Sequence, residues 1–172
     1  MSTHATGFKM PVSSTAQGAS STAEFQFFQS SGVAGSLPVP PGQLSNRLVR
    51  IKAGGRFTNV AGGATTFTAK INWGADIASD TNVATSGAMT ITTTSGNWNM
   101  DVVGYVDTGY KKFAGAYQGA HTAATPALIT RAIVSLTSFD PALAQSFNCS
   151  GQFSVSDAGN AATLDYFEVD LL

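Results

Sequence analysis

The sequence predicts an all-β protein, an eight-stranded antiparallel jelly-roll sandwich with an extended N-terminal arm. The first reason is a series of short alternating apolar and polar runs, which starts at residue 47 and is broken by Gly, Asn, Asp, Ser and Pro. The second is that no segment of comparable length shows a helical period. The third is the number of runs, because eight strands in two packed sheets is the count of a jelly roll. An immunoglobulin-like sandwich is the alternative.

The predicted arm comprises residues 1–46, which are rich in Ser, Thr, Ala and Gly and carry the sequence LPVPPG at residues 37–42. A segment with so few large apolar residues does not offset its own ordering entropy. We therefore expect it to order against a partner, with one short strand at residues 25–28; a disordered tail is an equal alternative for residues 1–17. Its predicted contact residues are Phe25, Phe27, Phe28, Leu37 and Val39.

The sandwich is predicted to span residues 47–172. Its eight strands, in chain order, are residues 48–57, 65–73, 88–93, 97–106, 111–119, 128–136, 147–155 and 163–171. In the second run, apolar residues from Phe67 to Trp73 alternate with Thr68, Lys70 and Asn72, which predicts one buried and one exposed face.

The fourth run carries the sequence SGNWNMDVVGY, in which an aromatic ring stands beside amides and a carboxylate. Such a group of side chains is typical of a sugar-binding groove. The alternation places Trp98 with Met100 and Val102 on one face, and Asn97, Asn99 and Asp101 on the other. A ring and polar groups on opposite faces do not line one groove, so we predict a sandwich strand. The predicted core comprises Trp73, Trp98, Phe113, Phe147, Phe153 and Phe167.

The surface predicted from the composition is neutral and polar. Charged residues make up 11% of the chain, against about 25% in an ordinary soluble domain. Small neutral polar groups cost little to desolvate, which suits wide contacts with other protein copies. The net charge of −1 gives no reason to expect a nucleic-acid partner.

We expect no secretory signal and no membrane span. The sequence has no apolar run typical of a secretory signal or of a membrane span, so no membrane partner is expected. A single cysteine, Cys149, excludes an intrachain disulfide and is compatible with synthesis in a reducing cytoplasm.

Groups suited to catalysis are scarce. His4 and His121 have no carboxylate or nucleophile at a suggestive spacing, and Cys149 shares a face with Phe147 and Phe153, as a small buried hydrophobe would. Asp157 and Asn160 could bind calcium, but SDAGNAA at residues 156–162 is more typical of a turn. We therefore predict no catalytic residue, no metal, no cofactor and no enzymatic activity.

Two charge clusters stand out against this neutral background. Arg47, Arg50, Lys52 and Arg56 surround the first strand, and Asp165, Glu168 and Asp170 lie in the last. The first and last strands of a jelly roll are neighbours, so we expect the clusters to lie close together. They form either a solvated rim of weak pairs or an intersubunit contact.

Residues 48–172 resemble a pattern found in small structural proteins of tailed bacteriophages. It consists of VRIKAGGRFTN, TTFTAKINWG, a Thr/Ser loop, SGNWNMDV, a strand of the FAGAYQG kind and a terminal FSVSDAGNAATLDYFEVDL, in that order. Proteins of this type are trimeric jelly-roll knobs that serve as head decoration (cement) proteins or as domains of tail and fibre proteins. The resemblance rests on the order and texture of strands, and it brings no catalytic residue with it.

The resemblance implies a non-enzymatic virion structural protein. We expect a decoration protein, made in the host cytoplasm and placed on the capsid exterior, that stabilises the capsid through a trimeric knob and its arms. Its partners would be the major capsid protein and two further copies of itself. The alternative is a tail-tip or fibre protein whose knob binds a host receptor through Tyr105, Tyr110 or Tyr117. An enzyme such as a depolymerase would need a pair of carboxylates in a cleft, which the sequence does not indicate.

Overall fold

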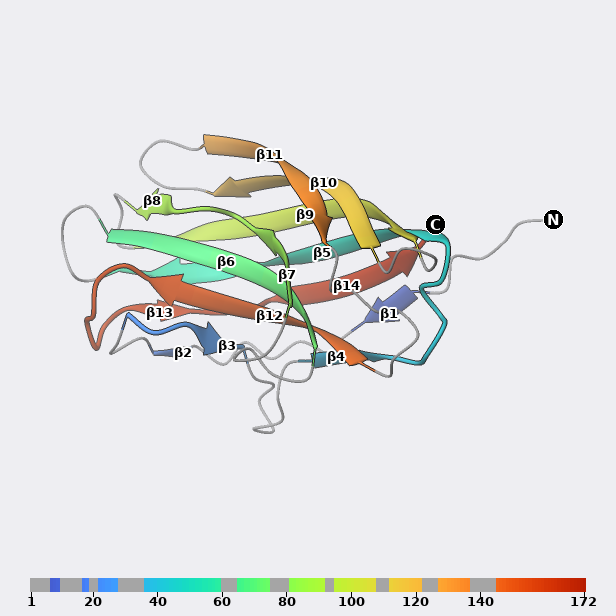
Figure 1. Ribbon diagram of the computed structural model, residues 1–172. Helices are drawn as coiled ribbons and strands as arrows, with labels where there is room; N and C mark the ends of the chain where they lie inside the picture. Colours follow the sequence, from blue (N-terminus) through green and yellow to red (C-terminus); the bar gives the residue numbers. More distant parts are fainter. Residues whose placement is uncertain are drawn as a thin grey trace.

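The computed structural model describes residues 7–9, 17–18, 22–27, 36–59, 65–74, 81–91, 95–107, 112–121, 127–136 and 145–172. These residues form strands and connecting turns, without a helix among them, and every strand pair is antiparallel. The two resulting sheets stack as two layers (Figure 1). The prediction of an all-β antiparallel sandwich of the jelly-roll type is confirmed.

The first sheet, which we call sheet A, contains the longest strands. Its order is β1 (Gly7–Lys9), β14 (Tyr166–Leu171), β5 (Arg47–Thr58), β9 (Ser95–Asp107), β10 (Lys112–His121) and β11 (Ala127–Leu136). Two short strands, β13 (Ala161–Ala162) and β2 (Gln17–Gly18), continue the sheet beside the end of β5.

The second sheet, sheet B, is built on one central pair. Its order is β3 (Phe25–Gln26), β12 (Gln145–Phe153), β6 (Thr65–Gly74) and β7 (Thr81–Thr85). In addition, β4 (Ser36–Val39) pairs with β12, and β8 (Met89–Ile91) pairs with β6. The predicted third strand, residues 88–93, corresponds to β8. β7 was not predicted, because its buried residues Val83 and Ala84 are flanked by polar residues in the sequence.

The strands are nested from the outside inward. β5 pairs with β14, β6 with β12 and β9 with β10, while β7 contacts β11. The first predicted strand is therefore beside the last and the second beside the seventh, which is consistent with a jelly roll. This arrangement confirms that the two charged strands are neighbours, with Arg50 opposite Asp170 in register.

Aromatic side chains fill the space between the sheets. Trp73, Trp98, Phe147, Phe153 and Phe167 are all buried, as predicted. Phe67 lies among them, with its ring centroid 5.1 Å from that of Phe153 and 5.7 Å from that of Trp98. Phe113, the remaining predicted core residue, lies in β10 opposite Val106.

The described segments of the arm pair with the edges of both sheets. β1 pairs with β14 and β2 with β13, whereas β3 and β4 follow one another along the same edge of β12 (Figure 1). The predicted strand at residues 25–28 is observed as β3; Phe28 lies outside the described residues. Within residues 1–17, where a disordered tail was the alternative, Gly7–Lys9 is a strand. A turn over residues 41–46 leads into β5.

Candidate functional site

The two predicted charge clusters meet on the outer face of sheet A. Arg56 donates to Asp165 through both Nε and Nη2, at 2.8 and 3.1 Å. Lys52 Nζ lies 3.8 Å from an oxygen of Asp170. The structure therefore brings together four of the seven predicted residues as ion pairs, and all of these side chains are partly exposed. Glu168 lies opposite Lys52 in register, and Arg47 is exposed at the start of β5.

Arg50, the remaining residue of the basic cluster, pairs with a residue outside the predicted acidic cluster. It donates through Nε to Asp101 Oδ1 at 2.9 Å and through Nη2 to Asp101 Oδ2. This hydrogen bonding, together with the charge of Asp101, raises the pKa of Arg50, and Asp165 raises the pKa of Arg56 in the same way. The alternation of the fourth run places Asp101 on the outer face, but only the pairing of β5 with β9 brings it to Arg50.

A tyrosine crosses the same face of sheet A. Tyr166 lies opposite Gly54, and a Cβ atom built on Gly54 would be 2.4 Å from the phenol oxygen. The glycine therefore makes room for the ring. Burial, with Asp101 and Glu168 nearby, raises the pKa of Tyr166. The space that the Tyr166 ring needs explains why the first predicted strand has a glycine, Gly54, in its sequence VRIKAGGRFTN.

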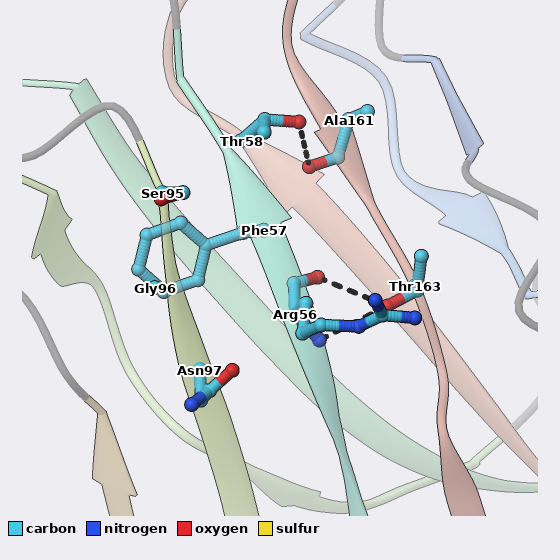
Figure 2. A pocket seen from close by; sticks show the side chains of 8 residues that line it. All are labelled: Arg56, Phe57, Thr58, Ser95, Gly96, Asn97, Ala161 and Thr163. Atoms are coloured by element: carbon cyan, nitrogen blue, oxygen red, sulfur yellow. Dashed lines mark hydrogen bonds between the residues drawn. The ribbon is translucent and has the colours of Figure 1, made fainter.

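A pocket of about 550 Å³ opens at the end of β5 and β9. Eight residues from β5, β9 and the β13 region line it: Arg56, Phe57, Thr58, Ser95, Gly96, Asn97, Ala161 and Thr163 (Figure 2). The Thr163 hydroxyl accepts from the Arg56 main-chain N–H at 3.0 Å, and the Thr58 hydroxyl donates to the Ala161 carbonyl at 3.4 Å. These hydroxyl, amide and guanidinium groups can bind a neutral polar ligand, but the lining residues include no carboxylate, histidine or thiol to serve as a general base.

The predicted contact residues of the arm lie against the chain's own core. Phe27, Leu37 and Val39 are buried, and Phe25 is partly buried with its ring 6.2 Å from that of Phe153. Main-chain bonds add to these contacts, since the Phe27 N–H donates to the Cys149 carbonyl at 3.1 Å. In a single copy, these apolar side chains thus close the sandwich along β12. Contact with a capsid or with a second subunit stays a prediction.

A polar network fastens the arm to the outer face of sheet B. Glu24 forms an ion pair with Lys70 and accepts a hydrogen bond from the Ser150 hydroxyl. Ser150 in turn accepts from the Asn72 side chain at 3.0 Å, and both Asn72 and Ser150 are buried. Sequence reasoning found the apolar residues of EFQFF but missed its glutamate, because the lysine partner lies on a distant strand.

The remaining candidates for chemistry have structural roles or lie outside the described residues. Cys149 is fully buried, which raises the pKa of its thiol far above the ordinary value. Asp157 accepts from the Gly159 N–H at 2.8 Å, so SDAGNAA forms a turn as predicted. His121 ends β10, whereas His4 and Tyr110 are not described. Of the receptor candidates, Tyr105 is exposed and Tyr117 lies opposite Val102.

The described part of the chain has neither a metal-binding group of His, Cys, Asp and Glu side chains nor a helix long and apolar enough to cross a membrane.

No family model matches the chain, and no curated protein matches it. Among solved structures, the chain is similar to one from infectious bursal disease virus, Gt strain, at 13% identity and a TM-score of 0.37, over 98% of this chain and 33% of that chain. It is also similar to the CBM2 module of the evolved Dit of Lactobacillus casei BL23 phage J-1, at 8% identity and a TM-score of 0.33, over 98% of each chain. The chain thus spans about a third of the bursal disease virus chain. Neither similarity identifies a family, so the function has to be inferred from the chain's own residues.

Proposed function

We propose that this protein is a non-enzymatic structural component of a virus particle, a head decoration protein that binds the capsid of a tailed bacteriophage as a homotrimer. The observation that carries the proposal is the arm, which adds four short strands to the edges of both sheets. Strand addition is a common way for one chain to bind another, because its affinity comes from main-chain hydrogen bonds.

The geometry of the arm suits exchange between copies. Its strands pair with β12, β13 and β14, and those edges are identical in every copy of the chain. An arm can therefore leave its own sandwich and pair with a neighbour's at low cost, as in domain swapping. On a particle surface, many such links resist internal pressure together through a multivalent effect.

The charge distribution agrees with this role. Five residues of the two predicted clusters pair within the chain, Arg56 with Asp165, Lys52 with Asp170, and Arg50 with Asp101. The chain carries a net charge of −1, and this pairing leaves a nearly neutral surface. Such a surface costs little to desolvate against a broad protein partner.

The deciding experiment adds the purified protein to phage heads that lack it. Sedimentation of the heads, followed by quantitative mass spectrometry, would measure the number of bound copies, and electron microscopy would show their position. Hundreds of copies on the capsid exterior would support the decoration role. A few copies at the tail would favour the second candidate below, and absence of binding to heads and tails would exclude both roles.

Arm exchange has its own test in the variant Gln26→Cys/Ser150→Cys. These residues face each other across β3 and β12, at a spacing suited to a disulfide. After oxidation on heads, covalent oligomers on a non-reducing gel would show that arms cross between copies. A monomeric, internally closed chain would exclude exchange, and the two single-cysteine variants control for random oxidation.

A receptor-binding knob of a tail-tip or fibre protein is the second candidate, and the pocket in Figure 2 favours it. Its volume of about 550 Å³ is within the range of small-molecule sites, about 300–1,000 Å³. Its hydroxyl and amide groups suit a glycan. Adhesion of the free protein to host cells, abolished by Asn97→Ala with Asn99→Ala as control, would support this function; adhesion that both variants keep would exclude the pocket.

A further inference from the structure

The outer face of sheet A gathers most of the exposed large apolar side chains of the described residues. Leu48, Val103 and Tyr105 are 41%, 37% and 45% exposed, and Tyr166 and Leu172 join them. Strand alternation and register place all five on this one face, across β14, β5 and β9. The sixth such residue, Val155, lies beyond β12 and outside sheet A. Four of them, Leu172, Leu48, Tyr105 and Val103, are contiguous, whereas Tyr166 lies beyond the rows of Arg50 and Lys52. A contiguous apolar patch marks an interaction surface.

An apolar row crosses the strands at one end of the face, and charged residues follow it, with Val103 opposite Arg50 in the next row. Leu48 lies opposite Tyr105 on β9, and the Leu172 N–H donates to the Leu48 carbonyl on the other side. Two rows further along, Lys52 lies opposite Asp101. Because Arg50 and Lys52 pair with acidic residues on the neighbouring strands, the face has alternating signs with little net charge, and it offers no binding energy to a strongly charged partner.

We propose that this face binds a second copy of the chain, through a twofold axis that runs parallel to the strands between β5 and β9. Rotation about that axis lays each β5 over the partner's β9 at the same height. Leu48 of each copy then meets Tyr105 of the other, and Lys52 meets Asp101. Self-complementarity of this kind is what an isologous interface requires.

The alternative twofold axis in the plane of the face is unfavourable. An axis perpendicular to the strands that crosses β5 between Arg50 and Lys52 would lay Arg50 over the partner's Lys52, and Asp170 over the partner's Glu168. Like charges held together in an interface oppose association. The order of charges along β5 and β14 therefore disfavours this perpendicular axis and favours the one parallel to the strands.

Strand β10, which lies next to β9, has alanines at three of the positions that would face the partner's β14. The same rotation lays β14 over the partner's β10, where Ala114, Ala116 and Ala120 occupy the register positions opposite Tyr105, Val103 and Asn99. Four strands and seven residues cover roughly 19 Å by 24 Å, and a standard interface buries about 800 Å² on each partner. We therefore expect a reversible association that depends on concentration.

This inference goes beyond the proposed function and does not depend on it. Sedimentation velocity and light scattering of the free full chain, from about 1 to 100 μM, a span chosen for an interface of modest size, would measure its mass. We expect a dimer, or a hexamer where threefold contacts also form. Leu48→Ser/Tyr105→Ser should halve that mass, while Val155→Ser, equally exposed but off the face, should leave it unchanged.

Charge substitution tests the orientation of the two copies. Lys52→Glu places a second carboxylate over the partner's Asp101 and should weaken association at least tenfold, and adding Asp101→Lys should restore it. A wild-type mass of one or three copies at every concentration would overturn the proposal, as would an even assembly that Leu48→Ser/Tyr105→Ser leaves intact. A trimer of that kind would still be compatible with the decoration role.

Discussion

Phe27 in the arm stacks on Trp98 in β9, with 5.7 Å between the ring centroids and 22° between the ring planes. Phe27 comes directly after β3, a short strand on the edge of sheet B, whereas Trp98 lies in β9, inside sheet A. The contact therefore joins the arm to both layers of the sandwich. It makes the arm part of the core in a single copy, and it gives the arm a measurable share of the stability.

Phe27→Ala should lower the free energy of unfolding by about 3–5 kcal/mol, because the ring is fully buried and its removal leaves a cavity. Phe25→Ala should cost clearly less, since Phe25 is only partly buried. Urea denaturation of the two variants and the wild type would measure the difference. Equal and small effects of both substitutions would mean that the arm does not pack against the sandwich in solution.

Gly151→Ala should loosen the arm without unfolding the sandwich. A Cβ atom at this position would lie 2.8 Å from a carbon of the Phe67 ring and 2.9 Å from one of the Phe25 ring. Phe67 is enclosed in the core, whereas Phe25 can move outward, so we expect a cost of about 1–3 kcal/mol and faster cleavage of the arm by protease. Cleavage at the wild-type rate would show that the close approach is absent.

Glu24 and Lys70 should show a measurable coupling energy. Both side chains are about three-quarters buried, and Glu24 also accepts from Ser150. We expect Glu24→Gln and Lys70→Met each to destabilise the protein, with a coupling of about 1 kcal/mol in a double-mutant cycle. The exposed pair Arg56–Asp165 serves as the matched control and should couple more weakly. Strictly additive effects at Glu24 and Lys70 would exclude a contribution from their ion pair.

The alternation of apolar and polar residues was sufficient to predict which side chains within a single strand are buried and which are exposed. It placed Trp98 in the core and Asn97 and Asn99 on the surface, because burial of one face leaves a period of two in the sequence. It did not indicate that Asp101 would pair with Arg50 or Glu24 with Lys70. Those contacts depend on which strands become neighbours and in which register, and that is decided by the packing of the whole sandwich.

The arm shows that amino-acid composition also has a limit as a predictor of contacts. Its composition indicates a segment that needs a partner, and in a single copy its described strands pair with the chain's own sheet edges. Composition measures how much apolar surface a segment can bury, but it does not identify the surface that receives it. Phe27 belongs to a short aromatic group, EFQFF, within a segment of small polar residues, and its position beside Trp98 makes it part of the core.

The folded state should lose stability at alkaline pH, because the Cys149 thiol and the Tyr166 phenol ionise less readily in it than in the unfolded chain. Burial raises the pKa of Cys149 and of Tyr166 above their ordinary values of 9.0 and 10.0. A group whose pKa is higher in the folded state ionises first in the unfolded state, so its contribution is complete below the ordinary value and is lost as the pH rises above it. We expect the melting temperature to decline from about pH 9 for Cys149, and more steeply above about pH 10, where Tyr166 adds its share. Cys149→Ala should remove the earlier part of the decline and Tyr166→Phe the later part. An alkaline profile that neither Cys149→Ala nor Tyr166→Phe alters would show that these two groups ionise alike in the folded and unfolded states.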